Sequence, residues 1–272
     1  MRFVGVNFPN MTLSFFKYQG TGNDFIIIDN RNTGNGHLTT EEIRHLCDRR
    51  FGIGADGLML LGESDGYDFS MIYYNANGLE GSMCGNGGRC MVKFAYDLGI
   101  HRSSYHFIAA DGPHEAELDL SGIVRLKMKD VSDVETIVDS YVLNTGSPHY
   151  VKFIENIKHY EVTREGQTIR NSKKYIKDGI NVNFVENIDD HTIYVRTFER
   201  GVEAETYSCG TGVTASALMA AHNDTGFNQV DVHTLGGKLS VEYDKIDERS
   251  FSNIWLSGPA EFVFKGDFDL KD

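Results

Sequence analysis

Two copies of one short motif, far apart in the chain, limit what this sequence can fold into. SMCGNGGRC contains Cys84, and YSCGTGVTAS contains Cys209, 125 residues further along a chain of 272. Each copy reads Cys-Gly-x-Gly and leads into an apolar pattern with near-helical spacing, over residues 88–98 and 211–222. Because the separation is close to half of the chain, we expect two similar halves, each with one apolar helix opened by this motif.

The rest of the sequence is typical of short strands. Segments rich in β-branched and aromatic residues alternate with Gly, Asn, Asp or Pro, and residues 136–143 are expected to form one such strand. One further helix is predicted over residues 41–50, after a Thr-Thr cap and before Gly52. The pattern predicts two α+β domains of similar plan, with a boundary near residues 127–133.

Charge and cysteine content exclude several classes of protein. The formal net charge of −13 argues against a sequence-independent nucleic-acid binder. No apolar run approaches the roughly 20 residues of a membrane span, and no secretion signal is found, so four cysteines in this chain indicate a reducing cytoplasm. The spacing of Cys84 and Cys90 does not suit zinc, so no metal is expected. Residues 1–10 are interpreted as a loose extension, or the biological start is Met11.

A Cys-Gly-x-Gly motif in front of a helix has a chemical meaning. The first turn of a helix leaves backbone N–H groups without partners and carries a partial positive charge, which suits a carboxylate. The same field favours the thiolate of an adjacent cysteine. If two such motifs face each other, one thiolate can remove the proton from the carbon beside a bound carboxylate while the opposite thiol delivers a proton to the other face. This geometry predicts racemisation or epimerisation.

The same residues also fit other interpretations. The glycines could serve only to pack helices closely. Cys47 and Cys90 lie inside helical patterns and are interpreted as buried structural thiols. Several polar residues in loops or at strand ends could bind an amino acid, because amides, a carboxylate and a guanidinium recognise its carboxylate and ammonium groups. They are Asn23, Asn75, His149, Asn181, Glu199 and Arg200.

Five tracts, in this order, resemble diaminopimelate epimerases. They are GTGNDFIIID, YYNANGLEGSMCGNGGRC, TGSPHY, GINVNF and FERGVEAETYSCGTGVTASA, and the resemblance runs from about residue 15 to 264. It implies conversion of L,L-diaminopimelate to the meso form, in lysine and peptidoglycan precursor synthesis, without pyridoxal phosphate, metal or other cofactor. It also implies two pseudo-symmetric domains, residues 1–128 and 129–261, each a β-rich barrel-like sheet around a central helix. The C-terminal strand, about residues 262–272, would return to the first domain, and a homodimer is expected.

The resemblance also implies roles for individual residues. Cys84 and Cys209 would be the acid/base pair, and His149 and Glu199 would help proton transfer near the sulfurs. Backbone N–H groups would hold the reacting carboxylate, at Gly85, Asn86, Gly210 and Thr211. The rest of the substrate would contact Asn23, Asn75, Asn181, Glu199 and Arg200, with the distal carboxylate on Arg200.

Two positions depart from the family pattern. Ser147 stands where many members have asparagine, which puts one substrate contact in question. Gly57 stands where some members have glutamine, which removes a side-chain contact. We expect neither change to alter the reaction.

Three rival functions are considered. Proline and hydroxyproline racemases are typically marked by Cys-Gly-His-Gly, but Asn86 stands in place of that histidine. A redox protein would join Cys84 to Cys209 in a disulfide. A non-catalytic amino-acid binder would not need two cysteines. The presence of both cysteines therefore favours an enzyme.

Overall fold

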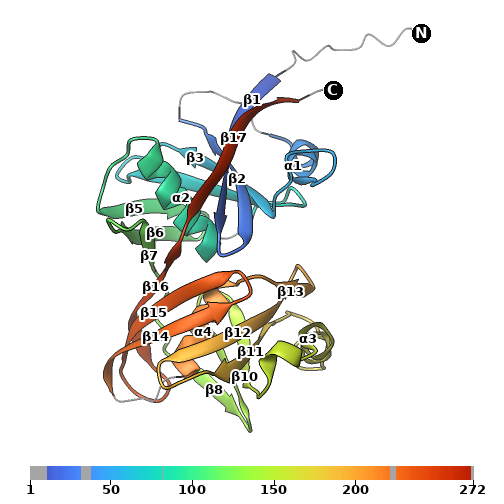
Figure 1. Cartoon of the computed structure of the whole chain (residues 1–272), viewed down its shortest axis with the longest axis vertical. Coiled ribbons are helices and arrows are strands. Elements are labelled where there is room, and N and C mark those ends of the chain that lie inside the picture. The colour runs from blue at the N-terminus through green and yellow to red at the C-terminus, as the bar shows by residue number, and fades with distance from the viewer. Residues whose placement is uncertain (1–10, 32–37, 82, 221–224, 271–272) are drawn as a thin grey trace, which may run out of the picture.

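The chain forms two lobes, each with one helix at its centre. A computed structural model describes residues 11–31, 38–81, 83–220 and 225–270, so the proposed extension over residues 1–10 lies outside the described part. Figure 1 shows α2 in one lobe and α4 in the other, with the two lobes stacked along the long axis.

The described residues of the first half form seven strands and two helices. They are β1 (Met11–Gly20), β2 (Asn23–Asp29), α1 (Thr40–Cys47), β3 (Gly57–Gly62), β4 (Phe69–Asn75), α2 (Gly85–Asp97), β5 (Ser104–Ala109), β6 (Gly112–Leu118) and β7 (Ile123–Lys127). The rest of the chain supplies β8 (Val134–Ile137), β9 (Ser140–Asn144), β10 (Pro148–Phe153), a 3₁₀ turn η1 (Ile157–His159), α3 (Val162–Arg170), β11 (Asn181–Asn187), β12 (Thr192–Glu199), β13 (Ala204–Thr206), α4 (Gly210–Ala220), β14 (Gly226–Thr234), β15 (Gly237–Lys245), β16 (Phe251–Pro259) and β17 (Glu261–Leu270).

The order of strand pairing repeats between the two halves. From β1 through β7, successive neighbours pair antiparallel, parallel, antiparallel, parallel, antiparallel and antiparallel. The series β9, β10, β11, β12, β14, β15 and β16 gives the same order. The helices fall at matching places: α1 and α3 follow the second strand of each series, while α2 and α4 follow the fourth. This correspondence is the pseudo-symmetry that the sequence predicted from its two motifs.

Two strands near the end of the chain tie the halves together. β16 completes the second series and also pairs antiparallel with β7. β17 then crosses to the first lobe and pairs with β1 over most of its length, which Figure 1 shows as the long strand running upward.

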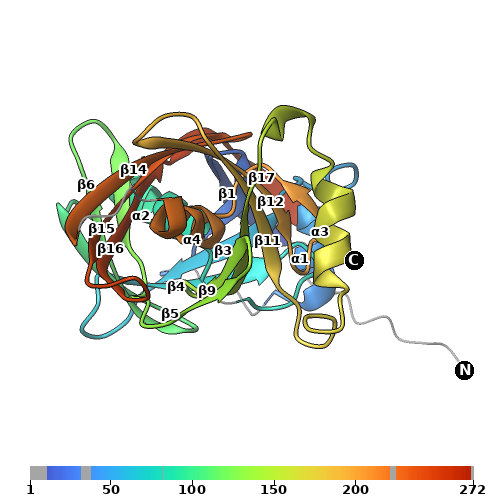
Figure 2. The same cartoon turned by 90° about the horizontal axis from the view of Figure 1, so that it is seen from below.

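The central helices are buried because the strands surround them. Seen from below, α2 and α4 lie inside the curved sheets (Figure 2). Apolar side chains of both helices belong to one continuous core, which includes Phe94 and Met91 of α2 with Val213 and Leu218 of α4. A helix that is small and apolar almost all round, such as α4, is stable only in such a surrounding.

The helix forecasts are confirmed with adjusted bounds, and one helix was missed. The helix predicted over residues 41–50 is α1, where Thr39 and Glu42 form a capping box. The last two residues of the forecast 211–222 lie outside the described residues. The unpredicted helix is α3, whose Gly166 and β-branched residues favour other structures. Gly166 is needed there because a side chain would collide with the Phe198 ring.

The single strand expected over residues 136–143 is wrong. The structure has a hairpin instead, in which β8 and β9 pair antiparallel. Its two-residue turn places Val138 at φ 41°. Because β-branched residues rarely adopt positive φ, nothing in this segment signals the turn.

Candidate active site

The two motif cysteines each stand immediately before a central helix, and the two helices begin side by side. Cys84 is the N-cap of α2, with extended backbone at φ −96° and ψ 129°. A methyl group placed on Gly85 would lie 3.7 Å from the Cα atom of Gly210, so the first residues of α2 and α4 are in contact. Both cysteines are free thiols. The structure therefore brings the two motifs together at the junction of the lobes.

Burial dominates the acidity of both thiols. It raises the pKa of Cys84 and of Cys209, and the negative charge of Glu199 raises both further. Backbone N–H groups at the helix starts lower the two pKa values, but only in part. The sequence had predicted that the helix field would favour thiolates. In this structure desolvation outweighs that field, because burial removes the water that would stabilise a negative charge on either sulfur.

Asn23 and Asn86 surround the sulfur of Cys84. The Cys84 thiol donates to Asn23 Oδ1 at 3.6 Å, and Asn86 Nδ2 donates to the same oxygen at 3.3 Å. Asn23 Nδ2 donates to Asp56 at 2.8 Å, and Asp56 is paired with Arg49. The amide of Asn23 is thereby held with its oxygen toward Cys84.

Cys209 has a different set of neighbours. Its sulfur lies 3.5 Å from the Thr211 hydroxyl, which is 2.9 Å from His149 Nε2. His149 is fully buried, and this burial, together with the charge of Arg200, lowers its pKa to about 3. The imidazole is therefore neutral at ordinary pH.

Two of the predicted binding residues, Asn181 and Arg200, form a cluster with Ser147. Asn181 Nδ2 donates to the Ser147 hydroxyl at 2.9 Å, and Arg200 donates to the same hydroxyl at 3.3 Å. The backbone N–H of Arg200 donates to Asn181 Oδ1 at 2.9 Å. Ser147 therefore contacts Arg200, which the sequence analysis assigned to the distal carboxylate, and Asn181, another predicted substrate contact.

Tyr73 was missed by the sequence analysis. Its hydroxyl donates to Asn75 Oδ1 at 3.2 Å, which fixes a predicted binding amide. Burial raises the pKa of Tyr73, and the charges of Cys84 and Glu199 raise it further. A side chain at Gly57 would lie 2.6 Å from the Tyr73 ring. The ring therefore occupies the space beside Gly57, so a glutamine cannot fit there without moving Tyr73.

Arg89 was also missed, although it is the only charged residue in GNGGRCMV. Its guanidinium is fully buried and donates to Thr21 Oγ1 at 3.2 Å and to the Pro259 carbonyl at 3.5 Å. It thus links α2 to the β1–β2 turn and to the end of β16. Its positive charge lowers the pKa of Cys84 in opposition to burial. An arginine inside an apolar helix pattern is the sequence signal that could have identified it.

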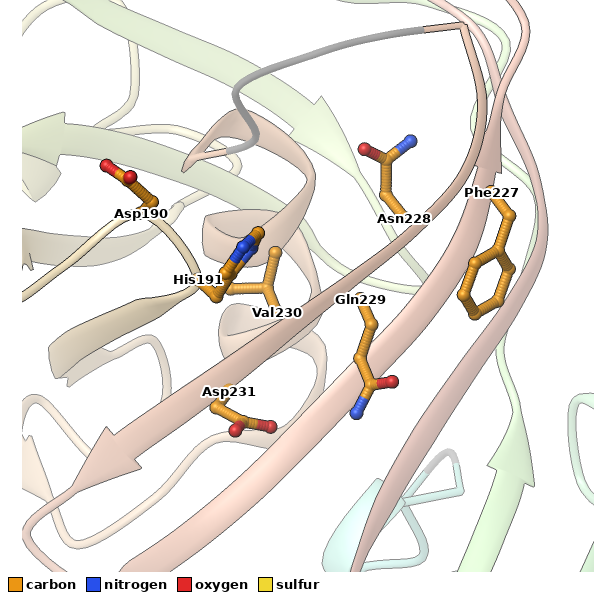
Figure 3. Close-up of a pocket in the computed structure, with 7 residues that line it drawn as sticks. All are labelled: Asp190, His191, Phe227, Asn228, Gln229, Val230 and Asp231. Carbon is orange, nitrogen blue, oxygen red and sulfur yellow. The ribbon is translucent and has the colours of Figure 1, made fainter.

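Within residues 11–31, 38–81, 83–220 and 225–270, no group of three or more His, Cys, Asp or Glu is placed to hold a metal, and no helix is long and apolar enough to cross a membrane. A hollow of about 630 Å³ contains no residue of the cysteine motifs (Figure 3). Its lining is Asp190, His191, Phe227, Asn228, Gln229, Val230 and Asp231.

Comparison with solved structures identifies the fold. The chain superimposes on a phenazine biosynthesis protein of the PhzF family from Bacillus anthracis with a TM-score of 0.71 at 17% identity, covering 95% of this chain and 99% of that one. A hydroxyproline epimerase from Agrobacterium vitis matches with a TM-score of 0.70 at 12% identity, covering 100% and 95%. These likenesses confirm the predicted α+β fold with two pseudo-symmetric domains.

Comparison at the sequence level identifies the family. The family model described as diaminopimelate epimerase matches residues 15–132 and 141–263. A diaminopimelate epimerase of Flavobacterium psychrophilum is 50% identical over 93% of this chain and 99% of its own. One from Chlorobaculum tepidum is 42% identical over 92% and 99%. This chain therefore belongs to the diaminopimelate epimerase family, as its motifs predicted.

Proposed function

We propose that this chain is an isomerase that converts L,L-diaminopimelate to meso-diaminopimelate with Cys84 and Cys209 as its acid and base. The observation that carries the proposal is the contact between Gly85 and Gly210, which sets two cysteine-led helix starts face to face. Family membership supplies the substrate class. The product would serve lysine and peptidoglycan precursor synthesis.

The reaction moves one proton off a carbon and another onto it. With the α-carboxylate on the backbone N–H groups at the two helix starts, one sulfur lies on each face of the α-carbon. One thiolate takes the α-proton, and the electron pair is stabilised by the N–H groups that bind the carboxylate. The opposite thiol then protonates the other face. Atoms and charge balance, because one cysteine gains a proton as the other loses one.

The remaining polar residues suit the rest of a diamino diacid. Asn86 Oδ1 is buried and has no hydrogen-bond partner among the described residues, so it is available to accept from the α-ammonium. Glu199 carries a charge that acts on both thiols and can pair with an ammonium group. Arg200, with Ser147 and Asn181 beside it, would receive the distal carboxylate.

Three further expectations complete the proposal. The domain boundary lies between residues 128 and 129, and β17 belongs to the first domain through its pairing with β1. A homodimer is proposed, and exposed Phe262, Val263 and Phe264 on β17 offer an apolar surface for it. The protein would act in the cytoplasm, where its thiols stay reduced. Light scattering of the purified protein tests the dimer.

Deuterium exchange tests the function directly. The reduced protein is incubated with L,L-diaminopimelate in D2O, with chelator and without pyridoxal phosphate, and with proline in a parallel tube. We expect deuterium at the α-carbon together with formation of the meso isomer. Exchange with proline alone would assign the chain to the racemases instead, and no exchange with either would return it to a redox or binding role.

Arg200→Lys separates binding from chemistry. Lysine keeps the charge but loses the bidentate fork, so KM for diaminopimelate should rise by about tenfold with kcat nearly unchanged. Steady-state kinetics measure both constants. An unchanged KM would contradict the role of Arg200 at the distal carboxylate.

A further inference from the structure

The amide of Asn183 is fixed in one orientation by its neighbours. Its Nδ2 donates to the backbone carbonyl of Tyr150 at 3.1 Å, and its Oδ1 accepts from the Thr197 hydroxyl at 3.0 Å. A flipped amide would set two acceptor oxygens against each other at Tyr150, because a carbonyl cannot donate. Asn183 is fully buried, so no solvent can relieve such a conflict.

This orientation determines the protonation of His149. Asn183 Nδ2 also lies 3.1 Å from His149 Nδ1, and an N–H donor there requires Nδ1 to be an unprotonated acceptor. The ring proton of a neutral imidazole must then be on Nε2. The lowered pKa of His149, a consequence of its burial, agrees with a neutral ring.

The protonation of His149 in turn fixes the Thr211 hydroxyl. His149 Nε2–H donates to Thr211 Oγ1 at 2.9 Å, so the hydroxyl cannot give its own proton to the imidazole. The sulfur of Cys209, at 3.5 Å, is the other hydrogen-bonding atom in contact with this hydroxyl among the described residues. The proton of Thr211 therefore points to Cys209.

We infer that Asn183 is a positioning residue which, through His149, commits the hydroxyl proton of Thr211 to the sulfur of Cys209. A donor at this place stabilises the thiolate form that the proposed reaction needs from Cys209. The inference deepens the proposed function and rests on it for its catalytic meaning. It gives His149 the role of a fixed donor rather than of a proton acceptor.

The second glycine of the Cys209 motif makes room for this chain of hydrogen bonds. A side chain on Gly212 would collide with the Asn183 amide oxygen and would lie 3.3 Å from His149 Cε1. The register of β10 and β11 sets His149 opposite Asn181, which brings Asn183 to the same face two residues on. The helix start and the two strands thus fix the arrangement together.

Site-resolved alkylation tests the inference without any substrate. The reduced protein is treated with iodoacetamide over a range of pH, and mass spectrometry follows Cys209 and Cys84 separately. In Thr211→Val and in Asn183→Leu, we expect Cys209 to react about three- to tenfold more slowly at neutral pH, because loss of one hydrogen bond raises the pKa of its thiol. Cys84 should keep its wild-type profile.

Two control variants separate the relay from a loss of packing. Thr211→Ser keeps the hydroxyl, so Cys209 in this variant should be alkylated at the wild-type rate. Thr214→Val removes a different hydroxyl of α4, which is buried and donates to the Gly210 carbonyl at 3.0 Å, and should leave the reactivity of Cys209 unchanged. An unchanged Cys209 profile in Thr211→Val and Asn183→Leu overturns the inference, as does equal slowing of both cysteines.

The protonation of His149 gives a second test in the wild-type protein. Nitrogen NMR, assigned by comparison with His149→Gln, should show the neutral Nε2–H form throughout the neutral range. A protonated Nδ1 or an imidazolium ring overturns the inference even if Asn183→Leu does not fold. Neither test depends on diaminopimelate, so a failed deuterium exchange and a failed relay are distinguishable.

Discussion

The surroundings of Cys84 and Cys209 differ, although the two cysteines occupy matching places in a pseudo-symmetric fold. At Cys84, charged residues at the edge of the lobe hold the partner amide: Asn23 is fixed by Asp56, and Arg49 bridges Asp56 and Asp24. At Cys209, the partner hydroxyl of Thr211 is held instead by neutral side chains, the buried His149 and, behind it, the buried Asn183. A repeated motif therefore does not impose a repeated environment.

The two sulfurs both receive backbone N–H groups, but their side-chain hydrogen-bond partners are of opposite kinds. Cys84 faces the amide oxygen of Asn23, an acceptor, which favours the protonated thiol. Cys209 faces the hydroxyl of Thr211, whose proton is directed to it, and this favours the thiolate. These side-chain contacts act on top of burial, which raises the pKa of both thiols.

The largest expected effect comes from removing either sulfur. Cys84→Ser and Cys209→Ser should each lower turnover by about 10³-fold, because a hydroxyl is a far poorer base at neutral pH. Deuterium exchange into diaminopimelate measures the loss. If either variant turns over near the wild-type rate, the two-thiol mechanism is wrong. The difference between the surroundings of the two cysteines would then have no catalytic meaning.

The matching second glycines of the two motifs should respond differently to the same change. In Gly212→Ala the new methyl meets the fixed amide of Asn183, so we expect destabilisation by about 2–3 kcal/mol and lower turnover. In Gly87→Ala the nearest atom, at 3.0 Å, is the flexible thioether of Met59, so stability should change little. Urea unfolding of the two variants checks this pair. Equal losses would contradict the contrast between a rigid and an adaptable neighbour.

As the pH falls, the stabilising contribution of His149, near Cys209, should be lost before that of Asp24, near Cys84. His149 has a pKa near 3 against an ordinary 6.5, so the unfolded chain binds a proton that the folded chain refuses. Stability should therefore fall as pH decreases from 6.5 toward 3, by about 1.4 kcal/mol per pH unit for this group.

Asp24 acts only at lower pH. Burial alone would raise its pKa, but hydrogen bonds from Arg49 and Lys17 lower it to about 2, so its contribution to the stability of the fold is present above pH 3.8 and disappears below.

Urea unfolding at several pH values tests the role of His149. Between pH 6.5 and 4, the free energy of unfolding should depend less steeply on pH in His149→Gln than in the wild type. The same slope as in the wild type would mean that His149 is not the group that titrates.

The smallest effect is expected at the charged support of Asn23. Asp56 is partly exposed, and Asp56→Asn keeps an acceptor for the Asn23 amide, so kcat/KM should fall by only about two- to fivefold. In this variant the alkylation rate of Cys84 should change, while the alkylation rate of Cys209 should stay at its wild-type value. A matching change at Cys209 would show that the two surroundings are not independent.

Sequence reasoning proposed the cysteines, the asparagines and Arg200 as site residues because their residue types carry the chemistry, and these roles stay predictions. It missed Asn183 and Tyr73, which lie within GINVNF and YYNANG, two of the tracts that carried the resemblance. Asn183 acts only through His149, 34 residues away in the chain, and Tyr73 fills a space that Gly57 leaves open. Neither relation has a local pattern, since each depends on the pairing of strands.

The sequence by itself determined two thiols at the starts of two apolar helices, because capping, helical periodicity and the need for glycine at a close approach are local properties. Family motifs added the substrate class. Tertiary structure alone decided that α2 and α4 begin in contact, that burial outweighs the helix field at both sulfurs, and that the two sulfurs have different partners. Desolvation and hydrogen-bond direction depend on which atoms surround a group in space, and residues distant in the chain supply most of those atoms.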